Sequence, residues 1–97
     1  AISVFPAAAA VDTRIVICGE TFDQTLPAAV TPPNTLWANV WSSGFVAVYD
    51  GTCSLLWSYQ FYGQDQNAST LITDVSIHVA SGMEVVTYCG VSSNGNY

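Results

Sequence analysis

The fold is decided by residues 45–62, which read FVAVYDGTCSLLWSYQFY. Two runs rich in aromatic and β-branched residues flank Asp50-Gly51, a pair that strongly favours a two-residue hairpin turn between apolar strands. Such a turn would place Val48 opposite Cys53. The face that Cys53 shares has a period of two and is apolar throughout, so we expect it to form the core: Cys53, Leu55, Trp57, Tyr59 and Phe61.

A second hairpin is expected between residues 71–79 and 83–90. Apolar residues alternate with Asp74, Ser76 and His78 in the first run, which is typical of a half-buried strand. Ser81-Gly82 is suited to the turn. A two-residue turn there would put Val86 and Tyr88 on the core face, with Cys89 facing outward.

The remaining segments complete a β-rich reading of the chain. Thr13–Cys18 predicts a strand. Five to seven short strands in 97 residues indicate a mostly β protein, a small two-sheet antiparallel β-sandwich or β-barrel. The alternative is an α+β sandwich with one short helix near 34–43, since Leu36/Val40 and Trp37/Trp41 recur at helical spacing. We expect one domain over 1–97, with 1–11 a loose N-terminal arm and 91–97 a frayed tail.

Charge excludes several classes of partner. The chain has seven acids and only one cation, Arg14, for a net charge of −6. A nucleic-acid binder needs several Lys or Arg to neutralise phosphates, so nucleic acid is not expected as a partner. Membrane insertion is not expected either, because no run approaches the roughly 18 apolar residues that a spanning helix requires. A neutral glycan or a protein surface is compatible with this charge.

The three cysteines, Cys18, Cys53 and Cys89, leave one without a partner inside the chain. Cys18 and Cys89 each end a strand on the outward side of the alternation, so we expect a Cys18–Cys89 disulfide. Cys53 is then a free thiol packed in the core, and the alternative is a cysteine that joins two protomers as a homodimer. No metal site or cofactor is expected, since no CxxC pair occurs and the single histidine is not near a cysteine.

Secretion is expected from several features of the sequence. Asn67-Ala68-Ser69 is a permitted N-glycosylation sequon, which makes Asn67 a candidate glycan acceptor. The cysteines are well separated, and surface polarity comes from Ser, Thr, Asn and Gln rather than Lys and Glu. This composition is similar to that of small secreted fungal proteins.

An enzyme is not expected. Asp74, Ser76 and His78 lie two residues apart along one strand, about 6.6 Å per step, and such a row rarely brings a base within hydrogen-bond reach of a nucleophile. No nucleophile elbow or glycine-rich phosphate loop occurs, and the acids are dispersed.

Aromatic residues are the one feature in excess. On a strand, Trp37 and Trp41 would form a ridge around Asn39, and an aromatic platform flanked by amides and carboxylates is what a sugar site needs. The sequence therefore predicts a glycan-binding, lectin-like domain with ligand-binding residues Trp37, Asn39, Trp41, Tyr62 and Asp65. Both tryptophans could instead be core residues. The alternative functions are a toxin, effector or immunomodulatory protein-interaction module, or an enzyme inhibitor acting through the proline-rich loop 27–34.

Overall fold

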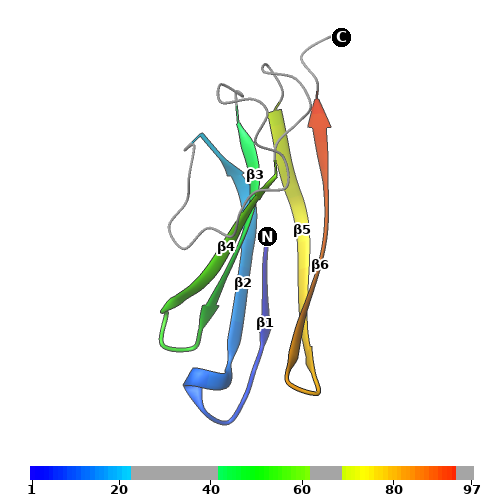
Figure 1. Ribbon diagram of the computed structural model, residues 1–97. Coiled ribbons are helices and arrows are strands. Elements are labelled where there is room, and N and C mark those ends of the chain that lie inside the picture. The colour runs from blue at the N-terminus through cyan, green and yellow to red at the C-terminus, as the bar shows by residue number, and fades with distance from the viewer. Residues whose placement is uncertain (23–41, 62–68, 94–97) are drawn as a thin grey trace.

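The computed structural model describes residues 1–22, 42–61 and 69–93, which form six β-strands and a short 3-10 helix (Figure 1). The elements are β1 (Ile2–Phe5), η1 (Ala10–Asp12), β2 (Arg14–Thr21), β3 (Ser43–Asp50), β4 (Leu55–Phe61), β5 (Ser69–Ala80) and β6 (Met83–Ser93). All pairings are antiparallel, in one sheet of order β1-β2-β3-β4 and a second of order β5-β6. This confirms the predicted mostly β, two-sheet sandwich, and the sheets do not close into a barrel. The helix considered near 34–43 falls almost wholly outside the described residues.

The core lies between the two sheets. β2 and β3 contribute Val16, Cys18, Val46 and Val48 from one side, and β5 contributes Ile72, Val75 and Ile77 from the other. β5 packs against β1, β2 and β3 across the core. At Gly44 the backbone of β3 lies close to the side chains of β5. A Cβ built on Gly44 would lie 2.8 Å from Cγ1 of Ile72, so glycine sets the sheet spacing there.

The predicted β5–β6 hairpin is confirmed. Ala80 pairs with Met83 across a turn in which Ser81 (φ 53°) and Gly82 (φ 76°) both adopt left-handed conformations. Two positive φ values define the turn type whose twist matches the strands of a hairpin. The register then pairs Ile77 with Val86 and Val75 with Tyr88 on the inner face, as expected.

The turn between β3 and β4 is longer than predicted. The Asp50-Gly51 two-residue turn is wrong: the loop runs over residues 51–54, and the Asp50 N–H donates to the Ser54 carbonyl at 3.0 Å. One carboxylate oxygen of Asp50 accepts the backbone N–H groups of Thr52 (2.8 Å) and Ser54 (3.2 Å) as well as the Thr52 hydroxyl. These bonds hold a loop that an Asp-Gly pattern alone does not reveal. A register irregularity between Val48 and Tyr49 then pairs Val48 with Trp57.

The longer turn also corrects the cysteine assignments. Cys53 is exposed at φ 66° in the loop instead of lying in the core. Cys18 is buried on the inner face of β2, opposite Val46, while Cys89 is exposed on the outer face of β6. All three thiols are free, so the structure has no Cys18–Cys89 disulfide. The two residues cannot pair because one points into the core and the other away from it.

One further expectation is corrected. Residues 2–5, expected in a loose arm, form β1, which pairs from Ile2↔Ile17 to Phe5↔Arg14. Ser58 and Gln60, on the face of β4 opposite to Trp57, Tyr59 and Phe61, are buried, and Gln60 Nε2 donates to Ser43 Oγ at 3.1 Å. No helix in the described residues is long and apolar enough to cross a membrane.

Candidate functional site: the β4–β6 groove

An aromatic groove lies between the edge strands β4 and β6, on the side of the sandwich where β5 does not cover β4. Its volume is about 300 Å³. We call it the β4–β6 groove. Its lining residues are Val46 from β3, Trp57, Tyr59 and Phe61 from β4, and Glu84, Val86 and Tyr88 from β6.

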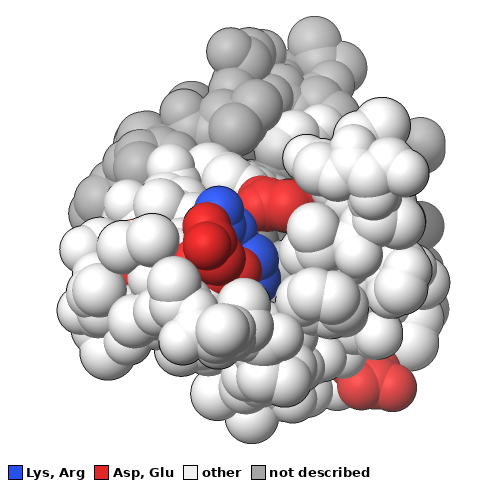
Figure 2. Space-filling model, turned by 90° about the horizontal axis from the view of Figure 1, so that it is seen from below, with Lys and Arg blue, Asp and Glu red and all other residues white. Residues whose placement is uncertain are grey.

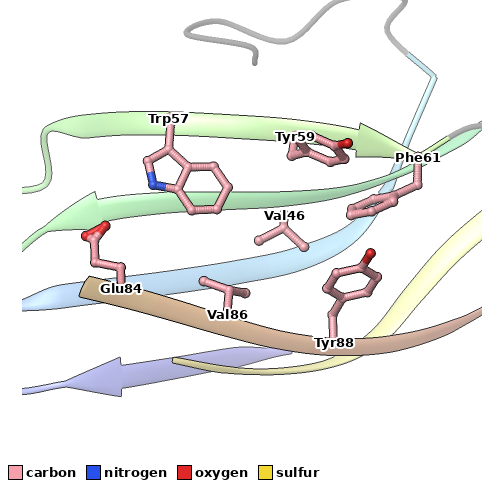
Figure 3. Close-up of a pocket in the computed structure, with 7 residues that line it drawn as sticks. All are labelled: Val46, Trp57, Tyr59, Phe61, Glu84, Val86 and Tyr88. Atoms are coloured by element: carbon pink, nitrogen blue, oxygen red, sulfur yellow. The ribbon is translucent and has the colours of Figure 1, made fainter. Parts of the chain in front are cut away.

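Strand alternation explains why these side chains converge. Residues 57, 59 and 61 share one face of β4, because they pair with Val48, Val46 and Gly44 on the inner face of β3. Residues 84, 86 and 88 share the inner face of β6 because the two-residue turn fixes their register. Figure 3 shows the two rows facing each other across the groove, with Val46 between them.

The groove is closed at one end by aromatic contacts. The ring centroids of Phe61 and Tyr88 lie 4.6 Å apart at an interplanar angle of 47°, which joins β4 to β6. Tyr59 extends the cluster, with its ring 4.9 Å from that of Phe61 at 55°. Both distances are in the favourable range for tilted aromatic pairs. The aromatics remain partly accessible, however, and Tyr88 is 48% exposed.

An ion pair lies at the other end. Arg14 Nε of β2 donates to Glu84 Oε2 at 2.7 Å, and both side chains are mostly buried. Figure 3 places Glu84 across from Trp57, whose indole nitrogen is drawn at that end of the groove. Because Arg14 compensates Glu84, the groove carries a polar carboxylate without a net negative charge. Its other polar groups are the indole N–H and the hydroxyls of Tyr59 and Tyr88.

This arrangement combines apolar ring faces with a few polar groups at their margins. Such a combination is typical of sites that bind small ligands. A neutral ligand suits it best. An anionic ligand would lie against Glu84, whereas a cationic ligand would have to compete with Arg14 for it.

None of the sugar-binding residues predicted from sequence is described by the structure. Trp37, Asn39, Trp41, Tyr62 and Asp65, and the sequon residue Asn67, all lie outside the described residues, as does the loop 27–34. Their predicted roles stay predictions.

The groove residues themselves were predicted as core. Trp57, Tyr59 and Phe61 do lie on the inner face, but they are half-buried since β4 is an edge strand that β5 does not cover. Glu84 is the clue in the sequence, because a carboxylate two and four residues from Val86 and Tyr88 is out of place on a buried face.

The row Asp74, Ser76 and His78 lies exposed on the outer face of β5, as predicted. The His78 ring packs edge-on against Phe5 of β1, with centroids 5.7 Å apart and planes at 88°. Asp74 accepts the Val75 backbone N–H at 2.9 Å. These contacts give His78 and Asp74 structural partners.

No protein-family model matches the chain, and neither a curated protein nor a solved structure matches it.

Proposed function

We propose that this chain is a secreted, non-enzymatic glycan-binding domain that holds a neutral saccharide in the β4–β6 groove. The observation that supports the proposal is the groove itself: partly exposed rings of Trp57, Tyr59 and Tyr88 beside a charge-compensated Glu84. Sugars present apolar C–H faces that stack on aromatic rings, and their hydroxyl groups require donors and acceptors at the margin.

The size and charge of the groove support a small, uncharged ligand. A volume of about 300 Å³ is at the lower end for ligand pockets. The net charge of −6 disfavours polyanionic sugars, because only Arg14 is available to neutralise them and it already bonds Glu84.

The test is a screen of the folded protein against neutral oligosaccharides of glucose, mannose, galactose and N-acetylglucosamine, followed by calorimetric titration of any hit. We expect selective binding to one sugar class. Tyr88→Ala should weaken it about tenfold, because a stacked aromatic contributes roughly 1 kcal/mol beyond its buried area. Phe22→Ala is the matched control, since Phe22 is 75% exposed and does not line the groove.

Two outcomes would contradict the proposal. Folded protein that binds no neutral sugar would redirect the function to a protein target. If Tyr88→Ala and Phe22→Ala bind equally well while Trp37→Ala or Trp41→Ala does not bind, the sugar site lies at the tryptophan pair instead.

A further inference from the structure

β6 is an unusually accessible edge strand. Of the ten residues 83–92, only Glu84 and Val86 are partly shielded, and the other eight are exposed. They include the large apolar residues Met83 (68%), Val85 (50%) and Val91 (64%). Within the described part of the chain β6 pairs only with β5, so one edge of an eleven-residue strand has no partner strand.

The hairpin register identifies the backbone groups at that edge. Residues flanking a two-residue turn form a hydrogen-bonded pair, and pairs alternate from there, so Val85, Thr87 and Cys89 direct their backbone groups toward β5. The intervening residues Glu84, Val86 and Tyr88 direct theirs to the free edge. By the same alternation, the backbone N–H of Ile77 points away from β6. It donates to Ser3 Oγ on β1 at 3.4 Å.

Proteins usually protect such an edge with lysine, proline, a bulge or an inward charge. β6 contains no Lys or Pro, and the bulge of this sheet is in β5, between Ile72 and Asp74. Its single charge, Glu84, is already paired with Arg14. A second copy that approaches this edge therefore meets no uncompensated carboxylate on β6 itself.

We propose that two copies of this chain form a two-fold dimer by antiparallel pairing of their β6 strands, centred on Thr87. This register sets Met83 opposite the partner's Val91 and Val85 opposite the partner's Cys89, so the exposed apolar residues meet one another. Glu84 falls opposite the partner's Gly90, which keeps the two carboxylates apart.

The dimer supplies what the smaller sheet lacks. A two-stranded sheet is marginal by itself, whereas pairing two β6 strands gives a continuous four-stranded sheet of order β5-β6-β6-β5. The two β4–β6 grooves then lie on either side of the two-fold axis. The proposed dimer uses the backbone edge and the outer face of β6, whereas a ligand in the groove would contact the inner-face side chains of Glu84, Val86 and Tyr88.

The test is sedimentation equilibrium under reducing conditions over a range of protein concentrations. We expect the wild type to approach twice the chain mass of 10.3 kDa. Thr87→Lys should weaken the dimer at least tenfold, because it places two lysines face to face at the axis. Ser76→Lys is the matched control: Ser76 is the exposed cross-strand neighbour of Thr87, but it lies on β5. A wild type that stays monomeric, or equal weakening by both variants, would overturn the proposal.

A cross-link tests the register. In a Cys53→Ser background, Val85→Cys should form a disulfide with the partner's Cys89 when oxidised glutathione is added; each bond consumes two thiols and reduces one glutathione disulfide to two thiols. The two positions are about 13 Å apart within one strand, so they cannot bond inside a chain. Covalent dimer formed from dilute protein supports the register centred on Thr87, and its absence from a sample that sediments as a dimer would overturn it.

Discussion

At the scale of single residues, the Asp50 side chain determines the structure of the loop between β3 and β4. Its carboxylate accepts three hydrogen bonds from Thr52 and Ser54 and so holds the loop between β3 and β4. The hydrogen bond from the Thr52 hydroxyl, followed by backbone hydrogen bonds from Ser54 and Thr52 and the charge of Arg14, keeps the pKa of Asp50 below its usual value, although desolvation opposes this. The loop therefore favours the ionised side chain.

A pH dependence of stability follows from this lowered pKa. In the unfolded chain Asp50 titrates near pH 4, whereas in the folded protein it titrates lower, so its ionised form stabilises the fold above about pH 4. This contribution is lost as the pH falls through the folded pKa. At pH 7 we expect Asp50→Asn to unfold at a lower urea concentration than the wild type. The difference between the two unfolding midpoints should shrink as the pH falls.

Urea denaturation at several pH values measures that difference. Asp12→Asn is the control for the loss of one negative charge, since Asp12 is exposed on η1. A difference between Asp50→Asn and wild type that stays constant down to pH 3 would mean that ionisation of Asp50 does not stabilise the loop.

At the scale of elements, the spacing between the sheets depends on Gly44 of β3. An added Cβ would meet Cγ1 of Ile72 at 2.8 Å and Cγ2 of Thr70 at 3.1 Å, both on β5. Such contacts are closer than packed carbon atoms tolerate, so β5 or the Ile72 side chain would have to move.

We expect Gly44→Ala to lower the free energy of unfolding by about 1–3 kcal/mol, the usual cost of overpacking a core. In an Ile72→Ala background the same substitution should lower the free energy of unfolding by less, since the closest clashing atoms are gone and only the contact with Thr70 remains. Chemical denaturation of the four proteins in this double-mutant cycle measures the coupling. Equal losses in both backgrounds would show that the sheets do not meet at Gly44.

At the scale of the whole molecule, Arg14 joins three segments of this acidic chain at one end of the sandwich. In Figure 2, which views the molecule from below, the blue of the single Lys or Arg side chain in the sequence lies between red carboxylates. Besides Glu84, the guanidinium donates to the backbone carbonyls of Val11 at 2.7 Å and Thr13 at 3.1 Å. Arg14 therefore connects β2, the η1 turn and β6, which closes the end of the sandwich beside the groove.

Unequal effects are expected from removing the two partners of this ion pair. Glu84→Gln should lower the free energy of unfolding by up to about 1 kcal/mol in low salt and by less at high salt, because the ion pair is partly solvated. Arg14→Gln should cost more, about 2 kcal/mol, since it also removes charged hydrogen bonds and raises the magnitude of the net charge. Thermal unfolding at two salt concentrations measures both, and equal losses would confine the role of Arg14 to the ion pair.

Local pattern alone was sufficient for much of the fold. The alternation of residues 71–79, the Ser81-Gly82 turn and the inward positions of Val86 and Tyr88 follow from a period of two and a turn of two residues, both local properties. The composition of β-branched and aromatic residues likewise determined the mostly β class, because such side chains fit a pleated surface.

Tertiary structure decided what depends on which strands meet. The residues around Asp50 are compatible with two turn lengths. The longer turn is held by local hydrogen bonds to Asp50 together with a long-range one, from the Gly51 N–H to the Ala10 carbonyl at 2.8 Å. Burial of Cys18 and exposure of Cys89 followed from sheet stacking, which excluded their disulfide. The same is true of the groove: sequence determined that Trp57, Tyr59 and Phe61 share a face, but only the stacking of β5 over β1, β2 and β3 left that face open at the edge.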